Sequence, residues 1–122
     1  MPAIPPFLLK KLYVKSSLRR TGDGFALDLT NPIASGVIQE MQSVELDGAP
    51  VSLELVAVVQ PDGQARPAGS LDASTPLSFP QGATFTLQVA ATPLGPGDHR
   101  LTIRVVVQDV GPLEIPVADR VD

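Results

Sequence analysis

Several residue types are scarce in this sequence of 122 residues, which has no cysteine, no tryptophan, one histidine and one tyrosine. Without cysteine the chain has no disulfide framework, no thiolate metal site and no cysteine nucleophile. A histidine-rich zinc or iron site within one chain is excluded, and a Ser-His-Asp triad would have to use His99. Aromatic residues make up 4%, so stacking platforms for sugars or single-stranded nucleic acid are poorly supplied.

Positive charge and long apolar runs are also limited. The net charge is −4, whereas a general nucleic-acid binder is normally basic. No apolar run reaches the roughly 18 residues that span a bilayer. Residues 1–9 are apolar and two lysines follow them, which is the reverse of the order in a secretory signal. We therefore expect no nucleic-acid partner, no membrane span and a cytoplasmic location, with which the absence of cysteine agrees.

The rest of the composition is typical of a packed globule. Hydrophobic residues make up 43% and charged residues 18%, and the length suits one domain over residues 1–122. Apolar and polar residues alternate with period two in several runs, which is the pattern of half-buried strands. These runs cover residues 12–19, 25–30, 51–60, 84–89, 99–108 and 113–117.

Turn residues connect these runs. Gly22-Asp23-Gly24 predicts a tight turn that makes a hairpin of the first two runs, and Asn31-Pro32 ends the second. Residues 36–46 fit either a helical stripe or a strand, and we favour a strand with a bulge that leads into an Asp47-Gly48 turn. Pro116 predicts an edge position for the last strand, because proline cannot donate to a ladder.

About seven mostly antiparallel strands and no secure helix predict an all-β fold, an immunoglobulin-like β-sandwich. Residues 61–82 form a long irregular stretch rich in proline and glycine, with a short strand expected near residues 77–79. Loops of this length are uncommon in compact domains and are often functional.

A candidate polar site involves His99 and the neighbouring Asp98. A general base or a metal ligand is the functional interpretation of His99. The structural interpretation is a residue at the mouth of the core, where a strand begins, and it is favoured because no nucleophile pairs with His99 by spacing. Three aspartates, Asp23, Asp47 and Asp62, lie in Asp-Gly turns, where the side chain caps its own backbone. We assign no catalytic residue, no metal ligand and no cofactor.

The N-terminal region has an unusual charge distribution. The first 21 residues carry a charge of +5 and no acid, whereas the remainder carries −9. The basic side chains fit an anionic partner, protection of an edge strand, or an acidic patch of another subunit. The last two interpretations are favoured over a nucleic-acid site. The basic residues are Lys10, Lys11, Lys15, Arg19 and Arg20.

An apolar arm, residues 1–9, precedes these charges and includes Phe7, Leu8 and Leu9. Such an arm docks on a partner or a membrane surface, or packs back on its own sandwich or on a sister subunit. We favour packing on protein. With the basic residues and Tyr13, the arm forms the predicted interaction surface.

Motifs at both ends of the chain resemble a family of short archaeal and bacterial proteins, some of which carry the name hydroxymethylglutaryl-CoA reductase. The name implies a mevalonate-pathway oxidoreductase with a nicotinamide cofactor. Such a reductase is several times longer and uses a lysine, aspartate, glutamate and histidine set with a dinucleotide-binding element. This chain has no such constellation and no glycine-rich fingerprint, so no catalytic residue is carried over. The motifs are residues 7–19 with Gly24-Phe25 and Asn31, then Gly97-x-His99-x-Leu101-x-Ile103, Gly111-x-Leu113 and Val117-x-Asp119.

Our leading hypothesis is a non-enzymatic β-sandwich that acts through protein–protein contact and forms a homo-oligomer, with an unknown protein as a further partner. A small-molecule-binding module that uses residues 61–82 is the alternative. An enzyme centred on His99 ranks third.

Overall fold

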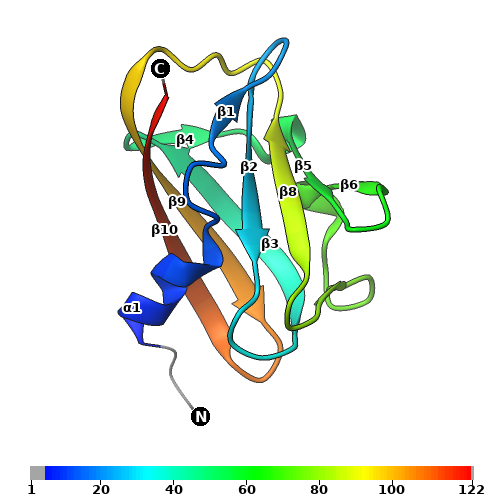
Figure 1. The fold of residues 1–122 in the computed structure, drawn as a ribbon. Coiled ribbons are helices and arrows are strands. Elements are labelled where there is room, and N and C mark those ends of the chain that lie inside the picture. The colour runs from blue at the N-terminus through cyan, green and yellow to red at the C-terminus, as the bar shows by residue number, and fades with distance from the viewer. Residues whose placement is uncertain (1–4, 122) are drawn as a thin grey trace.

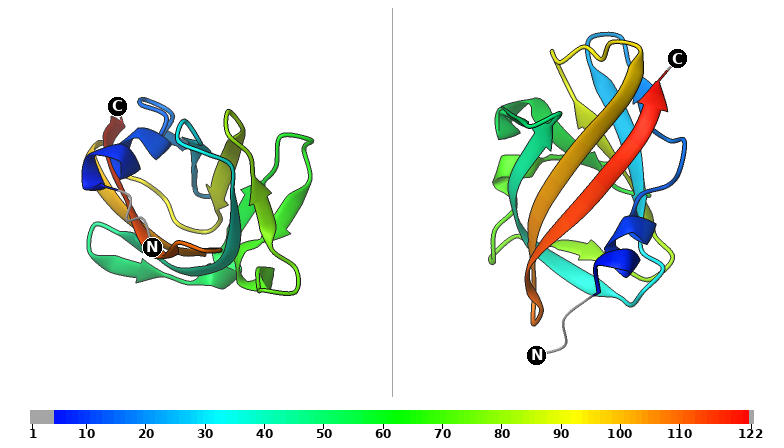
Figure 2. Two further views of the ribbon diagram at one scale, coloured as in Figure 1. Left: turned by 90° about the horizontal axis from the view of Figure 1, so that it is seen from below. Right: turned by 90° about the vertical axis from the view of Figure 1, so that its left-hand side faces the viewer.

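Two antiparallel sheets pack face to face in the computed structural model, which describes residues 5–121 (Figure 1). Each sheet has five strands, and the sheets enclose one layer of apolar side chains (Figure 2). The predicted all-β sandwich is confirmed. The described residues contain more strands than the seven predicted, because several short strands occur in addition to the predicted runs.

The first sheet has the order β1-β2-β8-β5-β6. Its strands are β1 (Arg19–Arg20), β2 (Phe25–Thr30), β8 (Thr84–Val89), β5 (Val56–Val59) and β6 (Ala65–Pro67).

The second sheet has the order β10-β9-β3-β4, and β7 also pairs with β3. Its strands are β10 (Gly111–Val121), β9 (Gly97–Val107), β3 (Gly36–Leu46), β4 (Ala49–Val51) and β7 (Leu77–Phe79). The helices of the described chain are short: α1 (Pro6–Leu9) and the 3-10 turns η1 (Lys10–Leu12), η2 (Leu53–Leu55) and η3 (Ala68–Ser70).

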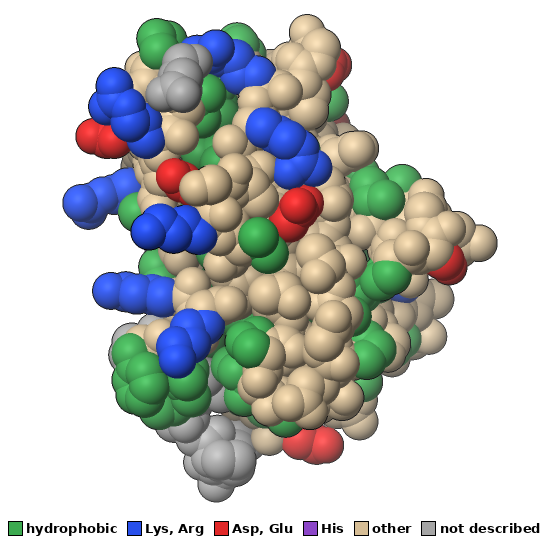
Figure 3. Space-filling model, in the orientation of Figure 1, with side chains coloured by type: hydrophobic (Ala, Val, Ile, Leu, Met, Phe, Trp, Pro, Cys, Tyr) green, Lys and Arg blue, Asp and Glu red, His purple; other side chains and the backbone are tan. Residues whose placement is uncertain are grey.

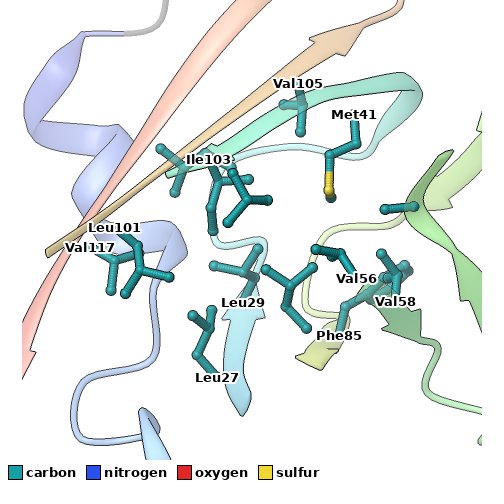
Figure 4. Packing of buried hydrophobic residues seen from close by; sticks show 14 of the residues in the cluster. Leu27, Leu29, Met41, Val56, Val58, Phe85, Leu101, Ile103, Val105 and Val117 are labelled. Carbon is teal, nitrogen blue, oxygen red and sulfur yellow. The ribbon is translucent and has the colours of Figure 1, made fainter. Parts of the chain in front are cut away.

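Alternation along the strands builds the core, because successive side chains point to opposite faces of a sheet. In β9, Leu101, Ile103 and Val105 are buried, whereas the residues between them face outward. Leu27 of β2, in the other sheet, belongs to the same buried cluster as these β9 side chains (Figure 4). The predicted inward faces of these strands are therefore the observed ones.

The ambiguous stretch of residues 36–46 is a strand, as favoured from the sequence. Its register against β9 shifts between Ile38 and Glu40 and again between Met41 and Ser43. Each irregularity adds a residue, so Ile38, Met41 and Val44 are all buried although they are three apart in sequence. The two bulges explain why this strand resembles a helical stripe.

Three other local predictions are confirmed. Asp47 and Gly48 both have positive φ (52° and 86°) and form the tight turn of the β3–β4 hairpin. β10 lies at the edge of its sheet, as Pro116 predicts. The short strand at residues 77–79 is β7.

The predicted strand over residues 12–19 is wrong for most of its length. Only Arg19 and Arg20 form a strand, and Tyr13 makes an isolated bridge to Leu29. Ser16 has a φ of 70°, which interrupts an extended chain. The segment turns away from β2 toward β10, so it cannot form a continuous ladder with β2.

The predicted strand over residues 51–60 is also wrong as a single element. It divides into β4, the turn η2 and β5, and β4 and β5 belong to different sheets. The chain crosses from one sheet to the other at η2, and one straight strand cannot belong to both. Apolar residues on both faces of this run reflect the crossing.

Candidate functional site

The N-terminal segment, residues 5–20, closes one open side of the sandwich. It runs between β2 and β10, which are near the edges of the two sheets (Figures 1 and 2). Leu9 and Leu12 are buried in the core. The expected apolar arm thus packs on its own sandwich over its described part, and residues 1–4 lie outside the described residues.

Tyr13 anchors this segment to the last strand. Its hydroxyl donates to Asp119 Oδ2 (2.6 Å) and accepts the N–H of Leu18 (2.9 Å). The N–H of Ser16 donates to the same carboxylate oxygen (2.7 Å). Burial, and then the bond to Asp119, raises the pKa of the Tyr13 phenol, and the same bond lowers the pKa of Asp119. Tyr13 is therefore a structural tie and not a free surface residue.

The basic residues of the segment divide into two groups. Arg19 pairs with Asp28 (3.3 Å), and Arg20 donates to the carbonyl of Leu94 (2.8 Å). Lys10, Lys11 and Lys15 are exposed and make no ion pair with any residue in the described part of the chain.

Figure 3 shows lysine and arginine side chains gathered along the side of the molecule that the N-terminal segment covers. The opposite open side is closed by η2 and η3, whose surroundings include the exposed carboxylates Glu54 and Asp72. Acidic side chains also lie on the N-terminal side, where Asp28 pairs with Arg19 and Asp119 binds the Tyr13 hydroxyl.

An apolar recess of about 380 Å³ opens at the end of the sandwich beside α1. Leu8 and Leu12 form one wall, and Val107 and Leu113 at the end of the β9–β10 hairpin form another. Ile38 and Phe79 also line it. A recess of this size and lining is in the range of ligand and partner sites.

Asn31 shapes the loop at the mouth of this recess. It is 4% exposed, and it is the buried polar residue among the described side chains. Its Nδ2 donates to the carbonyls of Ala34 and Phe79 (2.8 Å each), and its Oδ1 accepts the N–H of Ile33 (3.1 Å). From the sequence, Asn31 marks only the end of a strand; its place before proline is the signal for an Asx-type loop.

Phe7 is next to the recess and is 64% exposed. The following residue, Leu8, lines the recess, whereas Phe7 on the same helical turn faces solvent. Of the predicted interaction residues, Phe7 and all five basic residues are exposed, and Leu9 is not. Burial of Leu9 corrects its assignment to an interaction surface, since it belongs to the core.

His99 has both ring nitrogens engaged. Nδ1 lies 2.7 Å from Asp47 Oδ2 and Nε2 lies 2.6 Å from the carbonyl oxygen of Gly95. Both partners are acceptors, so the geometry suits an imidazolium that donates twice. The bond to Gly95, and then the bond to Asp47, raises the pKa of His99. The side chain is 13% exposed, so the ring ties the loop before β9 to the β3–β4 turn.

Asp98, the other residue of the candidate polar site, makes no hydrogen bond to the His99 ring within the described structure. Asp98 is exposed and lies 3.8 Å from Arg120, on the opposite face of β9 from His99. Adjacent strand residues point to opposite faces, which separates the two side chains. Asp47 also accepts the N–H of Arg100 (2.8 Å), and this bond is the main cause of its lowered pKa.

The long stretch of residues 61–82 holds β6, η3 and β7 and lines a second recess of about 390 Å³. Glu40 on β3 and Asp72 in the stretch bring carboxylates to it. Within residues 5–121, no group of three or more histidine and acidic side chains is placed to hold a metal ion. No helix of the described chain is long and apolar enough to cross a membrane.

Fold and recess together define a small β-sandwich domain with an apolar surface site at one end. The chain belongs to the family described as hydroxymethylglutaryl-CoA reductase, N-terminal domain, whose profile matches residues 8–122. The resemblance seen in the sequence is thereby confirmed. A comparison with curated proteins gives no match.

Proposed function

We propose that this chain is a non-catalytic β-sandwich domain that acts through protein–protein contact and associates with copies of itself through its N-terminal side. The observation that carries the proposal is the apolar recess of about 380 Å³, open to solvent beside the exposed Phe7. Contiguous exposed apolar surface of this kind marks an interaction site.

Charge supports a second copy as the partner. Lys10, Lys11 and Lys15 lie on one side of the fold without ion pairs in its described part, and the chain as a whole is acidic. One copy therefore offers both signs of charge. Complementary charges of this kind steer association and select the partner.

The state of His99 supports a non-catalytic role. A general base needs a free lone pair, and both ring nitrogens of His99 face acceptors at 2.6–2.7 Å. The family name is that of an enzyme, but the matched part is its N-terminal domain. These observations favour a binding role, and the cytoplasmic location of the proposed assembly rests on the sequence alone.

The molar mass in solution tests this proposal directly. Light scattering after size-exclusion chromatography is expected to give a multiple of 12.8 kDa at low salt. A lysine reversal, Lys11→Glu, is expected to weaken the assembly, and Arg100→Glu, which makes the same charge change on the outer face of β9, is the matched control. A mass of 12.8 kDa at low and high salt would refute self-association.

A small-molecule-binding module is the second candidate, because residues 61–82 contribute to the recess that contains Glu40 and Asp72. A thermal-shift screen with metabolites and metal ions separates the two proposals. A ligand selective for the native state raises the melting temperature. Such a ligand, with a monomer at every salt concentration, would favour this candidate.

A further inference from the structure

We infer that the contact between copies is reciprocal: Phe7 of each copy occupies the apolar recess of the other, and Lys10 and Lys11 face Asp109 of the partner subunit. This inference rests on the proposed self-association and specifies its surface. Two features lie at the same end of the fold. The side chain of Phe7 is exposed, and an apolar recess beside it is open to solvent.

The recess is large enough for this side chain. An apolar cavity of about 150 Å³ accommodates benzene. The recess measures about 380 Å³, so it holds a phenyl ring with room for part of the neighbouring turn. A small ligand in the recess would leave Phe7 in water, whereas a second copy covers both features.

Phe7 cannot fill the recess of its own chain in this arrangement. Leu8, the next residue, already forms part of the wall, and the side chain of Phe7 leaves the same turn toward solvent. Because the protruding group and the recess belong to one patch, a twofold axis beside α1 satisfies both copies at once. This is the property of an isologous interface, which closes as a dimer.

The charged side chains at the rim of the recess are compatible with the same twofold axis. Lys10 and Lys11 lie on η1, next to the Leu8–Leu12 wall, and Asp109 lies at the tip of the β9–β10 hairpin, between Gln108 and Val110 of the opposite wall. All three are exposed, and none has an ion pair within the described residues. A twofold axis through the recess brings the basic rim of one copy toward the acidic rim of the other.

The first test changes each half of the contact separately. Phe7→Ser removes the protruding group, and Phe7→Leu is the conservative control that keeps it apolar. Ala34→Phe fills the mouth of the recess. Ala34 is exposed, and its hydrogen bonds with Asn31 use the backbone N–H and carbonyl of Ala34, so we expect the loop bonds to persist. We expect Phe7→Ser and Ala34→Phe each to raise the dimer dissociation constant at least about tenfold, and Phe7→Leu to change it less.

Mixing the two weakened variants gives the decisive result. The Ala34→Phe copy still carries Phe7, and the Phe7→Ser copy still has an open recess, so one of the two contacts forms again. We expect the mixture to associate more tightly than either variant alone, as measured by light scattering or native mass spectrometry. Circular dichroism checks that each variant is folded.

The possible outcomes distinguish this inference from the proposal beneath it. A wild-type protein that is monomeric at all salt concentrations overturns both. A wild-type oligomer whose dissociation constant is unchanged by Phe7→Ser overturns the reciprocal contact alone, as does a trimer or a mixture no tighter than its parts. Native mass spectrometry that finds a small apolar molecule retained by a monomer also overturns it.

Discussion

At the scale of single residues, His99 shows how a candidate catalytic group becomes a structural one. Its two acceptors come from different elements, the β3–β4 turn and the loop before β9. Asp47 adopts a φ of 52° in that turn, which aims its carboxylate at both the imidazole and the N–H of Arg100. The nearby Arg20 is the cationic group whose charge opposes protonation of His99.

The raised pKa of His99 predicts a pH-dependent contribution to stability. A histidine whose folded pKa exceeds its unfolded value of 6.5 stabilises fully below pH 6.5, and that contribution is lost as the pH rises through the folded pKa. We expect the stability advantage of the wild type over His99→Gln to be largest near pH 5.5–6 and to shrink at alkaline pH. Urea denaturation measures it, and NMR of the single imidazole gives the pKa directly.

The stability contribution of Asp47, the partner of His99, depends on pH in the opposite direction. The pKa of Asp47 is lowered, so its contribution is present above its unfolded value of 3.8 and is lost as the pH falls through the folded pKa. Asp98→Asn is the matched control for Asp47→Asn, because Asp98 is exposed on the other face of β9. An imidazole that titrates at or below 6.5 would contradict this account of His99.

At the scale of elements, the N-terminal segment has the largest difference between prediction and structure. The sequence pattern of residues 12–19 alternates as a strand does, yet only Arg19 of this range lies in a strand paired with β2, and Tyr13 makes an isolated bridge. Tyr13 and Ser16 instead bond to Asp119 on the edge strand β10. Three buried leucines, Leu9, Leu12 and Leu18, hold the segment on the core.

Removing the Tyr13 hydroxyl should loosen this segment. Tyr13→Phe deletes the bond to Asp119 and leaves the N–H of Leu18 without its partner, so we expect a loss of about 1–2 kcal/mol in the free energy of unfolding. Hydrogen exchange of residues 13–18 should become faster than in the wild type, with β9 unchanged. Asp119→Asn keeps an acceptor oxygen and should cost less. Unchanged exchange in the segment would show that the leucines alone hold it.

At the scale of the whole molecule, both sheets contribute to one cluster of buried side chains. Leu27 from β2 and Ile103 from β9 are fully buried on its two sides (Figure 4). Shared burial couples the sheets, because neither has another apolar layer to pack on. This coupling is consistent with the single domain predicted for residues 1–122, which stays a prediction.

Core truncations test that coupling. Leu27→Ala and Ile103→Ala should each lower the free energy of unfolding by about 2–5 kcal/mol, since each opens a cavity in a packed core. Both should shift one transition, seen alike by circular dichroism and by NMR signals from the two sheets. Thr102→Ala, on the outer face of β9, should change stability by less than about 0.5 kcal/mol. Separate transitions for the two sheets would contradict a single domain.

Much of the fold was predictable because its signals are local. Alternation in β2, β8 and β9, the Asp47-Gly48 turn and the edge proline Pro116 each depend on a few neighbouring residues. The bulges of β3 were harder to predict, since an extra residue changes the apparent period from two to three. The candidate site was only partly predictable: Phe7 and the lysines were identified, whereas the recess and Asn31 were not.

By itself, the sequence determined that the chain forms strands, where most of them turn, and that positive charge gathers at its N-terminus. These properties depend on side-chain size, backbone freedom and charge along a few consecutive residues. Only the tertiary structure decided that His99 meets Asp47 and that Tyr13 meets Asp119. It also decided that α1, the β9–β10 hairpin and the loop around Asn31 enclose an apolar recess. Those contacts join residues far apart in sequence, and the packing of one sheet on the other sets the distances between them.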